Sequence, residues 1–223
     1  MEIHFDEELT HLKQKLLQMA DIAQEMIGMA IGALSERKEE LTKKVAELEE
    51  KVNHMEVEIE DETVRLVAKR QPIAKDLRLL IAVLKINNDI ERVADQACNI
   101  AETAVYLLKE PPLKPLLIDI PNMARLAQNM IKESIQAFVH HDAELAKQVC
   151  RHDDQIDTIN DQTFRVLLTH MMENPRSITR AVDLILVSRN LERIADHATN
   201  ISEEVIFIEE GKNIKHHIQE SGE

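Results

Sequence analysis

The sequence predicts an all-α protein built as two repeated up-down-up three-helix bundles. The first observation is an internal repeat, because residues 91–102 match residues 192–203 at eight of twelve positions, at an offset of 101. The second is composition: aromatic residues make up only 2 % of the chain and Gly numbers four, which disfavours strands and hairpins. The third is that apolar residues recur at the three- and four-residue spacing of helices.

These stripes predict six helices, three in each half of the chain. Their expected spans are residues 6–34, 38–70, about 72–109, 122–140, 142–172 and 177–210. The second helix should end at Gln71-Pro72, because the residue before a proline avoids helical geometry. Gly211 suits the cap of the last helix, and Ser35 is expected to cap the second.

Two further features bear on how the helices pack. Gly28 and Gly32 lie one turn apart in the first helix, where they either let a neighbouring helix approach closely or only weaken the helix locally. The proline-rich stretch Glu110–Pro115 marks a boundary, so we assign residues 1–110 to the first bundle and 111–223 to the second. Short connections make neighbouring helices antiparallel, and one arrangement stacks the bundles through their helix ends.

The charge balance limits the classes of function. The formal net charge is −14, with 41 acidic against 27 basic side chains, which disfavours nucleic-acid binding. It fits cation binding, docking on a basic partner, or simple solubility. The acidic start of the chain lacks an apolar signal core, no apolar run approaches the ~20 residues of a membrane span, and two cysteines make no disulfide framework. A cytoplasmic protein with at most peripheral membrane association is expected.

Each copy of the repeat carries a row of acids and one asparagine on one side of its helix. The rows are Glu91, Asp95, Asn99 and Glu102 in the first copy and Glu192, Asp196, Asn200 and Glu203 in the second. Each row begins one residue after the apolar stripe, so it lies at the shoulder of the core. No Lys or Arg follows Glu91 or Asp95 by four residues to offset their repulsion.

The helix before each row is acidic in the same relative place. Glu49, Glu56 and Glu60 follow apolar positions by one residue in the first half, as Asp153 and Asp157 follow His152 and Ile156 in the second. If the shoulders face each other, the carboxylates either take up protons or bind cations, and oxygen ligands favour hard ions such as Mg, Mn, Ca or iron. The alternative is that they are ordinary solvated faces. The predicted metal ligands are Glu91, Asp95, Glu56, Glu60, Glu192, Asp196, Asp153 and Asp157.

Other candidate sites are weaker. His197 has Gln96 as its counterpart in the first copy, which argues against a shared ligand or phosphotransfer role. Glu8-Leu-Thr-His11 fits the Glu-x-x-His of di-iron bundles but has no second copy, and Cys98 suits packing. The chain shows no Gly-rich phosphate loop, zinc spacing or nucleophile elbow. No catalytic residues are assigned, and the chain is not expected to be an enzyme.

Three segments together resemble the PhoU proteins, accessory regulators of the bacterial phosphate-specific transport system. They are residues 91–100, residues 192–201 and Ala68-Lys-Arg-Gln-Pro-Ile-Ala-Lys-Asp-Leu-Arg78. The resemblance covers nearly the whole chain and includes its length and its duplication. It implies a PhoU-like pair of three-helix bundles in a cytoplasmic, often dimeric protein.

The resemblance also implies negative control of phosphate uptake and of the phosphate-starvation response, through the phosphate ABC transporter and its sensor histidine kinase. The family's Glu/Asp-x-x-x-Asp motif, linked to multinuclear clusters of iron or another metal such as Mg, Mn, Ca or Zn, falls on Glu91/Asp95 and Glu192/Asp196. Two mechanisms stay open at this point. Either the metal clusters help to form a docking surface, or the bundles are a general helical adaptor, chaperone-like, with incidental metal binding.

Overall fold

The computed structural model describes residues 2–113 and 119–211, which form long α-helices and one short 3-10 helix and, within these ranges, no strand. The all-α prediction is thus confirmed. The elements are α1 (Glu2–Glu36), α2 (Glu40–Arg70), α3 (Ala74–Leu108), α4 (Ile120–His140), α5 (Ala143–Glu173), η1 (Pro175–Ser177) and α6 (Ile178–Glu210). At about 1.5 Å per residue, the 35 residues of α3 extend over roughly 50 Å.

The ends of the helices follow from local chemistry. Gln71 adopts a left-handed conformation (φ 48°) before Pro72 and ends α2, and Gly211 (φ 69°) ends α6. Asp119 accepts a hydrogen bond from the backbone N–H of Asn122 at 3.3 Å and caps α4. The prediction for Ser35 is wrong, because α1 continues through it and α2 begins after Glu39 without a side-chain cap.

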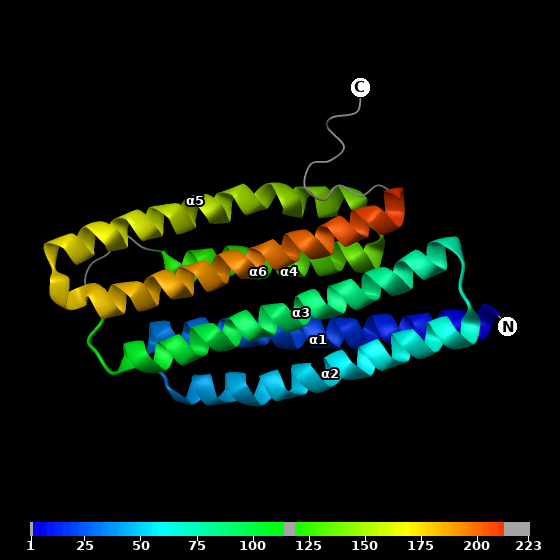
Figure 1. The fold of residues 1–223 in the computed structure, drawn as a ribbon, viewed down its shortest axis with the longest axis horizontal. Helices are drawn as coiled ribbons and strands as arrows, with labels where there is room; N and C mark the ends of the chain where they lie inside the picture. The colour runs from blue at the N-terminus through cyan, green and yellow to red at the C-terminus, as the bar shows by residue number, and fades with distance from the viewer. Residues whose placement is uncertain (1, 114–118, 212–223) are drawn as a thin grey trace, which may run out of the picture.

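The two halves lie side by side along the length of their helices. Figure 1 shows α3 beside α6 at the centre, with α1 and α4 behind them and α2 and α5 at opposite edges. End-to-end stacking of the bundles is therefore wrong. Buried residues of α1 to α6 join one continuous apolar core across the boundary at residue 110. The division into domains 1–110 and 111–223 stays a prediction.

A close approach between α1 and α4 explains one of the glycines. A Cβ atom on Gly28 would stand 3.3 Å from Nε2 of Gln128 on α4, and that side-chain amide donates a hydrogen bond to the carbonyl of Gln24 at 3.1 Å. The small residue thus admits the neighbouring helix, as one of the two sequence-based interpretations proposed.

Polar contacts reinforce the α3–α6 interface. Lys85 Nζ lies 3.0 and 3.1 Å from the two carboxylate oxygens of Glu204, whose side chain is only 2 % exposed. Nδ1 of His197 lies 2.8 Å from Oδ1 of Asp89, and Nδ2 of Asn200 donates to the same oxygen at 3.2 Å. These contacts fix one half of the chain against the other. Across the described helices, none is apolar over a length that could cross a membrane.

We expect Lys85→Met to lower the free energy of unfolding by about 2 kcal/mol, because it removes the ammonium group beside a buried carboxylate. Lys69→Met, which disrupts an exposed ion pair with Glu8, should cost less than about 1 kcal/mol. The double variant Lys85→Met/Glu204→Gln should recover part of the loss. Urea unfolding followed by circular dichroism measures all three, and equal losses for Lys85→Met and Lys69→Met would contradict the assignment.

Candidate functional site

The acidic rows lie where α3 and α6 come to the surface beside α2 and α5. Both central helices are buried on their core stripes: Ile90, Val93 and Ala97 on α3 are at most 1 % exposed. The next residues around the helix are therefore the first to reach solvent. Side chains of Glu91 and Asp95 are 16 % and 30 % exposed. Because partial burial disfavours the charged form of a carboxyl group, it acts to raise the pKa of that group.

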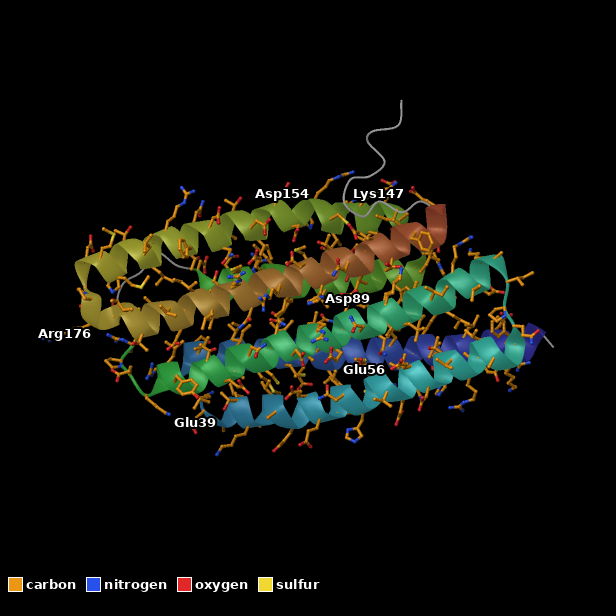
Figure 2. All side chains as sticks on the ribbon, viewed as in Figure 1. Glu39, Glu56, Asp89, Lys147, Asp154 and Arg176 are labelled. Atoms are coloured by element: carbon orange, nitrogen blue, oxygen red, sulfur yellow. The ribbon has the colours of Figure 1, made fainter. Side chains whose placement is uncertain are left out.

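In the first repeat the acids of α2 and α3 interact. Burial raises the pKa of Glu91, and the negative charges of Asp95 and Glu56 raise it further. Glu56 is half-buried and Glu60, one turn further along α2, is exposed. Glu56, which Figure 2 labels on α2, thus lies near enough to Glu91 to repel it, as the facing shoulders predicted.

Arg92 compensates the acidic row of this repeat in part. Arg92 folds back along α3, so that its Nε lies 3.4 Å from Glu91 and its Nη1 lies 3.3 Å from Asp95. The i,i+4 rule overlooked an arginine that reaches both acids from one and three residues away. Arg92 is 53 % exposed, so solvent weakens this compensation and the pKa of Glu91 still rises.

In the second repeat the acids gather more densely. Burial raises the pKa of Asp153 to about 6, and the charges of Asp196, Asp157, Asp154 and Glu192 contribute to the rise. Burial likewise raises the pKa values of Glu192 and Asp196, and each feels the charge of Asp157. The four residues predicted here are therefore mutually repulsive neighbours drawn from α5 and α6.

The two repeats differ in their second-helix acids. At the offset of 104 between α2 and α5, Glu56 corresponds to Asn160 and not to an acid. Asn160 donates a hydrogen bond to Oε2 of Glu192 at 3.0 Å, and its own carbonyl oxygen accepts one from the Ser188 hydroxyl at 2.7 Å. This chain of hydrogen bonds holds the Glu192 carboxylate in place. Sequence patterns missed it because neither Asn160 nor Ser188 stands out by spacing.

The residues present fit a hard cation in their chemistry. All eight predicted ligands are carboxylates, and one oxygen of Asp153 and the hydroxyl oxygen of Thr199 are buried without a hydrogen-bond partner. Within residues 2–113 and 119–211, however, no three Asp, Glu, His or Cys side chains stand where they could together hold a metal ion. The metal ligands thus stay a prediction. Glu60 and Asp157 are among the more exposed of the predicted ligands.

The two thiols are titratable groups beside the acidic rows. Burial raises the pKa of the buried Cys98 thiol well above its usual range, and the nearby carboxylate of Glu49 raises it further. Burial also raises the pKa of Cys150 to about 11. The predicted ligand set contains only carboxylates, and neither thiol is assigned to it.

His197 has a structural role that sequence analysis left open. Its contact with Asp89 crosses from α6 to α3, and Figure 2 labels Asp89 between these helices. Its positive charge, when protonated, would also lower the pKa of Glu91 in the other repeat. Asp89 was missed because it stands one residue before the apolar position Ile90, where an isolated helix gives no hint of a partner.

Comparisons with known proteins point to one family. The model of the PhoU domain matches residues 16–104 and again residues 120–205. A phosphate-specific transport system accessory protein PhoU homolog of Aquifex aeolicus is 41 % identical over 97 % of this chain and 98 % of that protein. Its counterpart in Pseudomonas putida is 39 % identical over 95 % of this chain and 83 % of that protein.

Solved structures agree with this relationship. The crystal structure of PhoU from Pseudomonas aeruginosa superposes with a TM-score of 0.90 at 36 % identity, covering 93 % of this chain and all of that one. The phosphate transport system regulatory protein PhoU from Streptococcus pneumoniae gives a TM-score of 0.85 at 26 % identity, over 95 % and 99 % of the two chains. The fold with its two repeats is thus shared with both.

We expect Asp153→Asn to raise the free energy of unfolding of the chelator-treated protein by about 1 kcal/mol at pH 7. The substitution keeps the shape of the side chain and removes a half-buried charge that other acids repel. Asp154→Asn, at an exposed neighbouring position, should change stability by less than about 0.5 kcal/mol. Urea unfolding in the presence of EDTA provides the measurement, and a loss of stability in Asp153→Asn would mean that a partner already satisfies this carboxylate.

Proposed function

This chain belongs to the PhoU family, and on that premise we propose that it is a cytoplasmic negative regulator of phosphate uptake and of phosphate-starvation signalling. It acts by binding the phosphate ABC transporter, its sensor histidine kinase, or both. The observation that carries the proposal is the match of the PhoU domain to both repeats, together with high identity over nearly the whole length of relatives named as accessory proteins of phosphate transport.

The proposed protein is not an enzyme. Its chemistry is that of a docking surface, because the acids of α5 and α6 form a cluster of carboxylates that repel one another. It works as a homodimer, without nucleic acid and with at most peripheral membrane association. Phosphate status changes the strength of its contact with the transporter or the kinase.

Metal clusters on each bundle form part of this proposal. Glu91, Asp95, Glu56 and Glu60 would hold one site, and Glu192, Asp196, Asp153 and Asp157 the other. Burial and mutual repulsion raise the pKa of Glu91 and Glu192, and a cation relieves the same repulsion that a proton relieves. Iron is the metal that family membership favours, with Mg, Mn, Ca or Zn as further candidates. The metal would supply positive charge that orders the carboxylates.

The second candidate is a general helical adaptor, chaperone-like, with incidental metal binding. One observation favours it: within the described parts of the chain, no three potential ligands are placed to hold a metal ion together. The two candidates differ in whether loss of metal abolishes regulation.

We expect protein purified without added metal to contain bound metal. The double variant Glu192→Gln/Asp196→Asn should lose the metal bound to the second repeat. Glu91→Gln/Asp95→Asn should do the same for the first. Elemental analysis by mass spectrometry gives the metal-to-protein ratio. The matched control is Glu47→Gln/Glu50→Gln, which changes two exposed acids of α2 and should leave the ratio unchanged. Undiminished metal in both motif variants removes the metal sites from the proposal.

Deleting the gene should derepress the phosphate-starvation genes in phosphate-rich medium, because the negative regulator is gone. A reporter fused to such a gene measures the effect, and the wild-type gene supplied in trans restores repression. If expression stays low in the deletion strain, the regulatory role is wrong. Complementation with Glu192→Gln/Asp196→Asn then separates the candidates, since the adaptor needs no metal and represses normally.

A further inference from the structure

Large apolar side chains stand exposed at one end of the second repeat. Their exposed fractions run from 42 % for Val182 to 78 % for Met172. Soluble monomers seldom leave such side chains clustered in water, so a cluster of this kind commonly marks a binding surface. We call it the α5–α6 apolar surface, and its members are Phe164, Leu168, Met172, Ile178, Val182 and Leu186.

Helical register places the α5 members in one row. Phe164 and Leu168 each follow a buried residue, Thr163 and Leu167, by one position, so they lie at the shoulder of the core. Asp157 occupies the same shoulder two turns earlier, after the buried Ile156. The apolar row of α5 is therefore a continuation of its acidic row.

The α6 members form a second apolar row at the same end of the molecule. Ile178, Val182 and Leu186 are spaced by four residues and form one strip on the exposed side of α6. Because α5 and α6 pack along their lengths and are joined through η1, both apolar rows lie at the same end of the molecule, where Figure 1 shows the α5–α6 connection.

The first repeat has a smaller version of the same feature. At offsets of 104 and 101, Leu168 and Val182 correspond to Val64 and Ile81. These residues are also exposed, by 56 % and 42 %. Solubility favours polar residues at exposed positions, so apolar residues there in both copies indicate a binding role. The second copy has the larger apolar surface, which indicates that it binds more strongly.

Charge indicates what covers this surface. The acidic group next to it, Asp153, Asp157, Glu192 and Asp196, carries four formal negative charges against two from Arg189 and Arg193, which oppose the pKa rise of Glu192. A complementary binding partner therefore presents an apolar surface with a basic surface next to it. An anionic lipid surface is disfavoured by the net charge of −14, and a second copy of this chain would bring no surplus of basic groups.

We propose that the α5–α6 apolar surface receives an amphipathic helix of a protein partner. The helix presents apolar side chains three and four residues apart to Phe164, Leu168 and Val182. In the metal-free protein its adjoining turns carry Lys or Arg that meet Asp157 and Glu192, in place of the cation that these carboxylates would otherwise bind. This inference rests on the proposed function, because it names the place and the chemistry of the docking that regulation requires.

Two synthetic helical peptides of 18 residues test the proposal, with EDTA present so that metal content has no influence. Both carry leucines at i, i+4, i+7 and i+11, and their remaining polar positions are Lys in one and Glu in the other. Fluorescence anisotropy should give a Kd on the order of 10 μM for the Lys peptide and binding at least tenfold weaker for the Glu peptide. The double variant Leu168→Ser/Val182→Ser should raise the Kd of the Lys peptide at least tenfold. The matched control Val64→Ser/Ile81→Ser should stay within about twofold of wild type, and circular dichroism checks that both variants fold.

Several outcomes overturn the proposal. Equal losses in the two double variants would remove the preference for the second repeat, and equal binding of the two peptides would remove the role of charge. Binding to phosphatidylglycerol vesicles that Leu168→Ser/Val182→Ser abolishes would assign the surface to a membrane. A dimer that the same variant converts to monomer in sedimentation would assign it to a second copy. None of these readouts depends on phosphate-regulated expression, so they can fail while the proposed function holds.

Discussion

The packing of α3 against α6 is the constraint on which the rest of the structure depends. Each of these helices is buried by its own bundle and again by its counterpart, and Lys85–Glu204 and His197–Asp89 fix the register between them. Their free surface is thereby reduced to a narrow outward strip. The strip carries the acids, so the same contact that joins the two halves also sets how far each carboxylate stands from water.

The two acidic clusters share a motif but differ in the residues around it. In the first, Glu56 repels Glu91 and Arg92 reaches both members of the motif. In the second, an asparagine takes the place of Glu56 and orients Glu192, while additional acids of α5 accumulate beside it. The duplicated motif therefore sits in two electrostatic settings, so the two proposed metal sites would differ in their affinity for a cation.

Most of the fold could be predicted from the sequence because its signals are local. Stripe spacing, Gln71-Pro72 and Gly211 determined the helices to within a few residues. The side-by-side arrangement could not be predicted, because it depends on which further face of α3 packs against the other bundle. The sequence of one helix does not show which face that is. For the same reason Asp89 and Asn160 were missed: each acts through a residue from a distant part of the chain. The proximity of Glu56 to Glu91 was predictable. The contacts of Arg92 with Glu91 and Asp95 on the same helix were not, because they depend on the rotamer of Arg92.

The polar contacts between the halves have a consequence for the equivalence of the two repeats. In a symmetric pair of identical units, each bond across the axis occurs twice. Here Lys85 has Leu186 as its counterpart and Glu204 has Thr103, so neither half alone could rebuild the bridge by pairing with itself. Each moiety has become the specific complement of the other. A dimer built from either repeat alone would therefore lack this bridge, so the two halves cannot replace one another.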